Sequence, residues 1–456
     1  MTQPGMVRIG PAGTALRQAS LREHNLALVL RQIAIARSQT GTAGSAGAAD
    51  RPPSCADLAG TTGLTRATVS ALVDDLIGGG LLTEVEPAPR TGAGRPALGL
   101  VLATQGPAGL GLEINVDYLA ACVVDLTGAV RHREVRRVDL RPVAPAAALA
   151  RVAELAARAR AEAQRQGLTL AGTALAVPGL VTPTGVVRLA PNLGWHDVDV
   201  PAALAGPEPA QHRSAGPEPA RNLSAGPEPA RYLLVENEAN LAALGELHAG
   251  HPGPANFLYV SGEIGIGAGI ILNGSLFRGA RGWSGELGHI PVHPDGLPCR
   301  CGGRGCLERY AGQEAILTDA GQVGPPIPAD LAISRLAELA GRGDRPVTSA
   351  LAAAGTAIGV AVAGVINLLD VDTVVLGGIY APLAAWLAPP VEAEIRRRVL
   401  TAAWSPVTVR PALLGSDAAV LGAAGSVVRG VLEQPARWLS PSRPTGPPAA
   451  RSAQTR

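Results

Sequence analysis

The chain has 456 residues and a formal net charge of +2, and all 39 of its basic residues are arginine. This length is sufficient for two or three domains that each bury a hydrophobic core. The absence of lysine excludes a Walker A phosphate loop and Schiff-base chemistry, because both depend on a lysine side chain. With so small a net charge, any binding to nucleic acid must come from a local surface.

Residues 54–82 predict two short helices joined by a tight turn, after an amphipathic helix at 20–38. Ser54 can cap a first helix over Cys55 to Ala59. Gly63 can adopt the positive φ that a turn between the helices requires. This order is that of a helix-turn-helix.

The second helix of this pair is expected to read DNA. Thr65 can cap it, and an apolar stripe would face inward. Residues at the start of a recognition helix reach base edges in a major groove. The inward stripe is Val69, Leu72, Val73 and Leu76, and the candidate DNA-binding residues are Arg66, Thr68 and Ser70.

Two strands at 81–85 and 98–102 would complete a wing. Its tip carries Arg90 and Arg95 among glycines, which suits phosphates or a minor groove. We therefore expect a winged helix-turn-helix DNA-binding domain over 1–103. The alternative is a helical hairpin with solvated arginines.

From Gly109 onward the pattern alternates between strands, turns and helices, which predicts an α/β domain over 104–430. A Pro- and Gly-rich decapeptide repeat at 205–231 predicts a surface loop, and 431–456 predicts a disordered tail. The uncharged stretch 346–369 is long enough to span a bilayer, although a buried helix is the preferred interpretation.

Three cysteines and a histidine lie within eighteen residues and predict a tetrahedral structural zinc site. Glycines between the cysteines would let the backbone fold tightly around the metal. His293 is a competing imidazole ligand, and reduced, buried cysteines without metal are the alternative. The predicted ligands are His289, Cys299, Cys301 and Cys306.

The motif GELGH at 285–289, followed by CRCGGRGCLE at 299–308, resembles the signature of the ROK family of repressors, uncharacterised proteins and sugar kinases. The resemblance covers about 109–428, and the preceding winged helix resembles the family's xylose-repressor-like branch. It implies a two-lobed, actin-like, ribonuclease-H-like sugar-kinase-type domain. It also implies that His289 binds zinc through one ring nitrogen and a sugar hydroxyl through the other.

Polar side chains that can grip sugar hydroxyls in pairs occur at 191–195, at 236–240 and around the zinc cluster. Taken singly, each is more readily explained as a solvated or capping side chain, whereas as an ordered set flanking the zinc cluster they favour a sugar site. The resemblance implies that six of them line a sugar pocket: Asn192, Asn237, Glu238, Glu286, His289 and Glu308.

The same resemblance indicates that the phosphate loops of a kinase are degenerate here. The family's kinases have Asp-x-Gly-x-Thr on their first hairpin, whereas this chain has Glu113 to Asp117 with Asn115 at the glycine position. An expected Gly-Thr-Gly becomes Glu263 to Gly265. Carboxylates beside a triphosphate are repulsive. Unless the register is shifted by one or two residues, kinase activity is lost and Glu238 is a vestigial base position.

The sequence thus predicts a cytoplasmic, sugar-responsive transcription repressor with a structural zinc ion. Its expected partners are operator DNA, a small sugar such as xylose or glucose, and further copies of itself in a homodimer or homotetramer. No membrane is expected. The alternatives are an active sugar kinase with a DNA-binding appendage, and a regulator whose effector is a phosphosugar or a partner protein.

Overall fold

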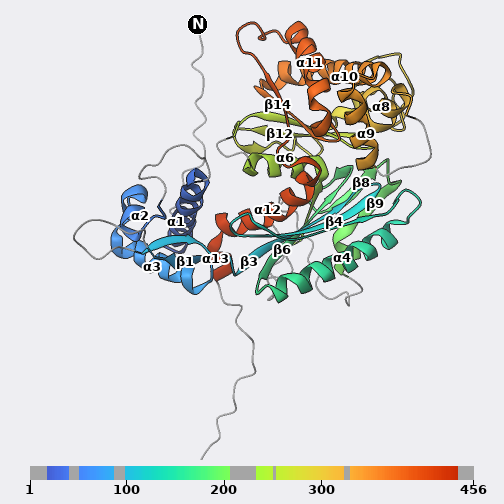
Figure 1. The fold of residues 1–456 in the computed structure, drawn as a ribbon. Helices are drawn as coiled ribbons and strands as arrows, with labels where there is room; N and C mark the ends of the chain where they lie inside the picture. The colour runs from blue at the N-terminus through green and yellow to red at the C-terminus, as the bar shows by residue number, and fades with distance from the viewer. Residues whose placement is uncertain are drawn as a thin grey trace, which may run out of the picture. The chain divides into compact units, whose positions relative to one another are not determined.

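The computed structural model describes residues 18–40, 51–86, 98–205, 233–249, 253–322 and 329–439. The chain divides into two compact units, which are described separately (Figure 1). Unit 1 comprises Met1–Ala103 with Gly430–Pro441, and unit 2 contains Thr104–Arg429. The wing tip with Arg90 and Arg95, the repeat over 206–231 and the tail beyond 439 lie outside the described residues.

Unit 1 contains the predicted pair of helices. Ser54 forms a capping box with Asp57, in which the Ser54 backbone N–H donates to Asp57 Oδ2 at 2.8 Å. The first helix runs to Thr62 and not to Ala59 as predicted, and Gly63 ends it with a φ of 72°. The Gly63 N–H donates to the Ala59 carbonyl at 3.1 Å, so the helix continues until this left-handed glycine ends it. The helices of this part are α1 (Gln18–Thr40), α2 (Cys55–Thr62) and α3 (Arg66–Gly78).

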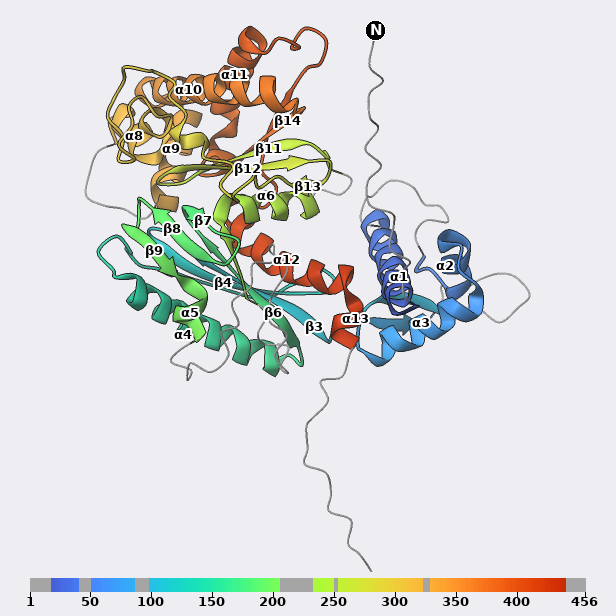
Figure 2. The same ribbon diagram turned by 180° about the vertical axis from the view of Figure 1, so that it is seen from behind.

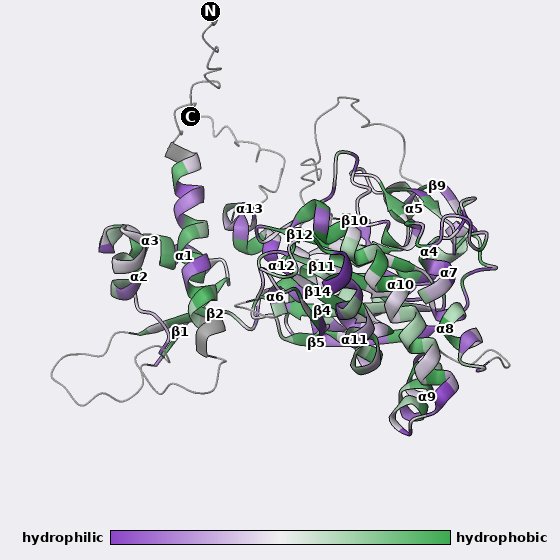
Figure 3. Ribbon diagram, turned by 90° about the horizontal axis from the view of Figure 1, so that it is seen from above, coloured by the Kyte–Doolittle hydropathy of each residue, from purple (hydrophilic) through white to green (hydrophobic). Residues whose placement is uncertain are grey.

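Helix α1 supplies buried apolar side chains to the core of unit 1. Its residues alternate between hydrophobic and hydrophilic along the helix (Figure 3), and the hydrophobic ones include the fully buried Leu26, Val29 and Leu30. They pack with α2, α3 and the hairpin of β1 (Leu82–Val85) and β2 (Gly99–Leu102). The two strands pair antiparallel, with Leu82 opposite Leu102. The order of helix, turn, helix and hairpin is that of a winged helix-turn-helix.

The C-terminal segment also belongs to unit 1. Helix α13 (Pro435–Leu439) packs on α1 and α3, and the Trp438 indole N–H donates to the Gly79 carbonyl at 2.9 Å. The prediction of disorder from residue 431 is therefore wrong for 431–439. Composition alone does not show that a short segment can bury Pro435 and Trp438 against distant helices.

Unit 2 consists of two lobes, each built on a five-stranded sheet. The first sheet has the order β10-β6-β3-β4-β5, with β3, β6 and β10 parallel and the β3-β4-β5 meander antiparallel. Helix α4 covers one face, and a small antiparallel sheet and α5 adjoin it. The elements are β3 (Pro107–Ile114), β4 (Tyr118–Asp125), β5 (Val130–Arg137), α4 (Pro145–Arg165), β6 (Thr169–Val177), β7 (Leu180–Val181), β8 (Val186–Ala190), β9 (Trp195–Asp199), α5 (Val200–Ala205) and β10 (Leu233–Asn237).

The second sheet repeats this topology. Its order is β13-β12-β11-β14-β15, again with an antiparallel meander followed by two strands that run parallel to the first. Helices α7 to α10 lie between β13 and β14 in the chain, α11 lies between β14 and β15, and all five contribute to the core of this lobe. The elements are β11 (Phe257–Gly262), β12 (Ile266–Leu272), β13 (Ser275–Leu276), α7 (Glu308–Ala311), α8 (Gln313–Asp319), α9 (Ala329–Gly341), α10 (Arg345–Leu369), β14 (Thr373–Gly378), α11 (Tyr380–Arg398) and β15 (Thr408–Pro411).

Helices α6 (Glu238–Ala249) and α12 (Ala418–Glu433) lie between the two sheets, as Figures 1 and 2 both show. A buried cluster joins them to both lobes, with Ala176 from β6, Leu241 from α6 and Tyr259 from β11. Two sheets of one topology around a central helix pair form the actin-like, ribonuclease-H-like fold that the resemblance implied.

Helix α10 corresponds to the uncharged stretch at 346–369. By length and composition it is the one candidate membrane span among the described residues. Its buried residues, including Leu351, Ile358 and Val362, pack in the core of the second lobe with α11 and β14. It is thus a core helix of unit 2, as the sequence analysis preferred.

Candidate effector site and metal centre

One cavity in unit 2 brings together the residues that the sequence analysis assigned to a sugar pocket. They reach it because parallel strands end at the same edge of each sheet. Asn115 follows β3, Glu238 follows β10 and Glu263 follows β11, and all three line the cavity. All six predicted sugar-binding residues line it as well: Asn192, Asn237, Glu238, Glu286, His289 and Glu308.

Asn237 holds the start of α6 in place. Its side-chain carbonyl accepts from the backbone N–H groups of Ala239 and Asn240, at 2.9 and 3.2 Å. Its amide donates to Glu238 Oε2 at 2.9 Å and to the Gly179 carbonyl at 3.1 Å. These bonds use most of its hydrogen-bonding capacity. Asn237 therefore positions the Glu238 carboxylate as well as lining the cavity.

Glu308 and Asn192 converge on Gly265 from different segments. A methyl group on Gly265 would lie 2.6 Å from Glu308 Oε2 and 2.8 Å from Asn192 Nδ2. No other residue fits this position without displacing both polar groups. The glycine thus leaves the carboxylate and the amide free to face one ligand.

His289 presents its two ring nitrogens to different surroundings. Nδ1 lies 3.9 Å from the Cys299 sulfur, and Nε2 lies 4.0 Å from Glu286 Oε2. Because Glu286 lines the cavity, the ring stands between the cysteine cluster and the cavity. This placement lets one nitrogen bind a metal while the other faces a ligand.

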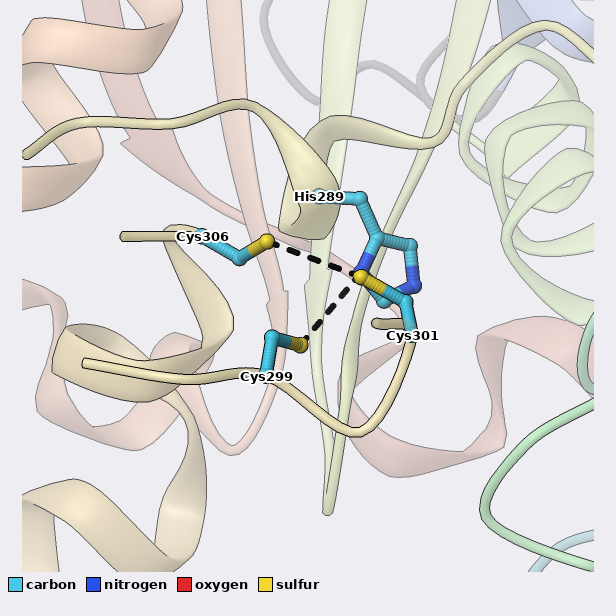
Figure 4. Close-up of side chains that lie close together, drawn as sticks. All are labelled: His289, Cys299, Cys301 and Cys306. Carbon is cyan, nitrogen blue, oxygen red and sulfur yellow. Dashed lines mark hydrogen bonds between the residues drawn. The ribbon is translucent and has the colours of Figure 1, made fainter. Parts of the chain in front are cut away.

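The side chains of His289, Cys299, Cys301 and Cys306 converge on one point (Figure 4). Their ligand atoms all lie within 4.8 Å of one another, and the sulfurs of Cys301 and Cys306 are 3.7 Å apart. Three sulfurs and one imidazole nitrogen at this spacing form a group that can hold one metal ion.

Backbone hydrogen bonds fold the loop around these sulfurs. The Cys299 N–H donates to the Gly303 carbonyl at 2.9 Å, and a β-bridge pairs Pro291 with Cys306. Gly305 has a φ of 69°, and a methyl group there would lie 1.6 Å from the His293 carbonyl oxygen. The His293 ring packs edge-on against Tyr310, with 4.6 Å between ring centroids. The competing ligand is thus not part of the cluster.

Four further cavity residues with polar side chains were not among the predicted sugar-binding residues: Asn115, Ser261, Glu263 and Arg300. Asn115 and Glu263 had been interpreted only as alterations of phosphate loops. Arg300 lies between Cys299 and Cys301 of the cluster, so the loop that contains them carries it to the cavity. Ser261 lies in a uniformly buried strand and gives no signal in the sequence.

Several carboxyl groups at this edge of the sheets have raised pKa values, with that of Glu286 raised mainly by burial. Burial raises the pKa of Glu238 to about 8, with further contributions from the charges of Glu286 and Glu113. Burial also raises the pKa of Glu113 to about 7 and raises that of Glu263. A buried carboxyl without a cationic partner retains its proton to higher pH.

Other buried acids in unit 2 are paired with arginine. Glu236 lies 2.7 Å from Arg278, and Glu246 lies 3.4 Å from Arg410. No salt bridge involves Glu113, Glu238 or Glu263 within the part of the chain that the structure describes. The carboxyl groups around the cavity therefore differ from the ordinary buried acids of this protein.

The DNA-binding candidates of unit 1 lie at the start of α3. Arg66 and Thr68 are exposed, and Ser70 is half-buried. The Thr68 hydroxyl lies 2.8 Å from that of Thr65, the residue that caps the helix. Arg66 is thus the basic side chain that this end of α3 presents to solvent.

Comparison with known proteins agrees with this combination of a winged helix and a two-lobed domain. The ROK family model matches residues 230–429. The xylose repressor of Bacillus subtilis is 26% identical over 83% of this chain and 91% of its own length. A ROK-family transcriptional regulator described as a homologue of the Escherichia coli MLC protein is 25% identical, with a TM-score of 0.69 over 92% of this chain and 99% of that chain.

A solved kinase-type structure is also similar to the second unit. The ROK hexokinase from Thermus thermophilus is 30% identical, with a TM-score of 0.53 over 71% of this chain and 99% of its own. Fold and site together define a sugar-kinase-type domain with a histidine-and-cysteine cluster, attached to a winged helix. The chain belongs to the ROK family.

Proposed function

We propose that this protein is a cytoplasmic, sugar-responsive transcriptional repressor. The observation that carries the proposal is the occurrence of two sites in one chain. An exposed Arg66 stands at the start of a capped recognition helix, and a polar cavity adjoins the cysteine cluster. The similarity to a xylose repressor and to a ROK regulator extends over both units, which favours a regulator.

In this proposal the DNA-binding domain is 1–103 and the sugar-binding domain is 104–430. Arg66, Thr68 and Ser70 contact the operator, together with Arg90 and Arg95 of the wing. The sugar binds to Asn192, Asn237, Glu238, Glu286, His289 and Glu308. A homodimer or homotetramer would match the twofold symmetry of an operator.

Zinc is the metal that suits the cysteine cluster. Ligands about 2.3 Å from a tetrahedral ion lie about 3.8 Å from one another. The Cys301 and Cys306 sulfurs at 3.7 Å, and Cys299 and His289 Nδ1 at 3.9 Å, match that spacing. His289, Cys299, Cys301 and Cys306 would hold the ion, which would stabilise the loop that carries Arg300 and Glu308.

We also propose that kinase activity is lost. The Glu263 side chain lies in the cavity and packs against Gly378, whose added methyl group would be 2.7 Å from Glu263 Oε1. The side chain takes up space beside this glycine, and any ionised fraction of its carboxyl group would also repel a triphosphate. Glu238 would then serve as a sugar ligand and not as a base.

A thermal-shift screen of the zinc-loaded protein with unphosphorylated aldoses tests the sugar site. A sugar at a hundred times its Kd should stabilise the protein by roughly 2.7 kcal/mol. Glu286→Gln should weaken that response, whereas Glu392→Gln, on the exposed side of α11, should leave it intact. A screen in which no free sugar shifts the melting temperature would argue against the pocket.

The second candidate is an ATP-dependent sugar kinase with a DNA-binding appendage. It is favoured by the similarity to a ROK hexokinase, which covers 99% of the hexokinase and 71% of this chain, and by the carboxyl group at Glu238. A coupled ADP-release assay with common aldoses separates the two functions. Turnover that disappears in Glu238→Ala would support the kinase, and we expect none.

A further inference from the structure

The backbone of helix α12 lies in direct contact with β3 and α6, the two elements that lead to the cavity. At these contacts a glycine leaves no side chain between the two backbones. A methyl group on Gly111 of β3 would lie 2.2 Å from the Val420 carbonyl oxygen of α12. One on Gly422 of α12 would lie 1.8 Å from the Leu241 carbonyl oxygen of α6. Figures 1 and 2 both show α12 between α6 and the sheet that contains β3.

Both of these neighbours end at the cavity. Asn115 follows the last residue of β3, and Glu238 is the first residue of α6. Both side chains line the cavity. A ligand that displaces either residue therefore acts on an element that is in backbone contact with α12.

A chain of hydrogen bonds leads from the cavity toward the start of α12. The Asn115 amide donates to the Tyr118 hydroxyl at 3.1 Å, and that hydroxyl donates to Glu113 Oε1 at 2.6 Å. The Glu113 carboxyl is buried, and the charge of Asp417, the residue before α12, contributes to its raised pKa.

The other end of α12 belongs to unit 1. The helix continues without a break to Glu433, and residues from Gly430 onward are part of unit 1. It is followed by α13, where the Trp438 indole donates to the carbonyl of Gly79, the C-cap residue of α3. Helix α3 carries Arg66 at its opposite end.

Contacts between backbones transmit displacement because no flexible side chain can absorb it. We propose that α12 couples the ligand state of the cavity to the DNA-reading unit through its close packing against β3 and α6, at Gly109, Gly111 and Gly422. This inference rests on the proposed function, since it concerns how the sugar would regulate DNA binding. In this inference the sugar and the operator DNA each favour a particular position of α12.

Hydrogen–deuterium exchange on the full-length protein tests the coupling without sugar or DNA. In Gly422→Ala, α12 must shift, because the added methyl group would otherwise clash with the Leu241 carbonyl. We expect amides of 66–78 and 435–439 to exchange at least about tenfold faster. The matched control is Gly425→Ala on the same helix, where a methyl group meets no atom within 4 Å. It should stay within about twofold of the wild type.

A second variant still tests the coupling if Gly422→Ala fails to fold. Val427→Ala deletes two methyl groups from a buried side chain that packs at Gly109 of β3, and it creates no clash. It should also accelerate exchange in unit 1. Exchange that changes only within unit 2 in both variants, while both remain folded, would overturn the coupling.

Operator affinity with and without D-xylose or D-glucose gives the functional readout. If the wild type responds to a sugar, Val427→Ala should bind that sugar within about twofold of the wild type but lose most of the change in operator affinity. A fully preserved change would overturn the inference. A wild type that binds no operator or responds to neither sugar contradicts the proposed function instead, and the exchange result still decides the coupling.

Discussion

Replacing Glu113 by glutamine should remove a pH-dependent loss of stability from unit 2. The Glu113 carboxyl is 2% exposed, and its Oε2 has no hydrogen-bond partner among the residues that the structure describes. Oε1 accepts the Tyr118 hydroxyl at 2.6 Å. A glutamine carbonyl can accept the same bond, so the variant removes the titration with little change in shape.

The magnitude follows from the pKa of Glu113. Burial raises this pKa from 4.5 to about 7, and one pKa unit corresponds to about 1.4 kcal/mol. The folded protein thus holds a proton that the unfolded chain releases between these two pH values. The contribution is fully present below pH 4.5 and is lost as the pH rises through 7. Between pH 5 and 8 the wild type should lose about 2.5 kcal/mol that Glu113→Gln retains.

Urea unfolding at several pH values between 5 and 8 measures this difference. The control is Glu394→Gln, a buried acid whose pKa is lowered by its hydrogen bond to Arg398 and by Arg397. Glu394→Gln should lower the free energy of unfolding by an amount that stays constant between pH 5 and 8. The reason is that the Glu394 carboxylate of the native protein is already ionised throughout this range. A difference between the wild type and Glu113→Gln that does not vary with pH would refute the reasoning.

Three further changes test other parts of the protein. Arg66→Ala should weaken specific operator binding by about 1–3 kcal/mol in competition gel shifts, and an unchanged sequence preference would remove it from the recognition surface. Cys301→Ser should lose the bound zinc and lower the Tm by more than about 5 °C, and stoichiometric zinc in the variant would contradict the ligand set. Trp438→Phe should cost unit 1 about 1 kcal/mol through loss of the bond to Gly79, with no change in zinc content.

The helix-turn-helix could be predicted because its signals are local. Ser54 and Thr65 precede their helices, and Gly63 follows the first with the positive φ expected of it. Capping and turn residues act over three or four positions, so the sequence displays them directly. Helix α2 ends three residues later than predicted because the left-handed residue that ends it is Gly63 itself, whose N–H still donates to the Ala59 carbonyl.

The C-terminal helix could not be predicted because its stability comes from contacts far away in the sequence. Trp438 and Gly79, which share a hydrogen bond, are separated by 359 positions. Five residues form no stable helix in isolation. The same limit applies to the contacts of α12, since no spacing rule relates Gly111 to Val420.

The cavity residues could be predicted only in part. A family motif led to Glu286, His289 and Glu308, but no pattern indicated that the same cavity includes Ser261 and Arg300. Nor does the sequence reveal that the Asn237 side chain forms its hydrogen bonds with the start of α6 and with Glu238. The residue type identifies a polar group, whereas its role depends on which partners the fold has already supplied.

Gly377 and Gly378 at the end of β14 show why glycines after a strand are weak support for nucleotide binding. A methyl group on Gly377 would lie 2.0 Å from the Tyr259 hydroxyl, and one on Gly378 would lie 2.0 Å from the Gly262 carbonyl oxygen. Gly378 also has a φ of 55°. Packing therefore requires both glycines whether or not a phosphate ever approaches them. The informative position is Glu263, which packing against Gly378 does not require to be acidic. Its carboxyl group bears on the choice between kinase and regulator, and the glycines beside it do not.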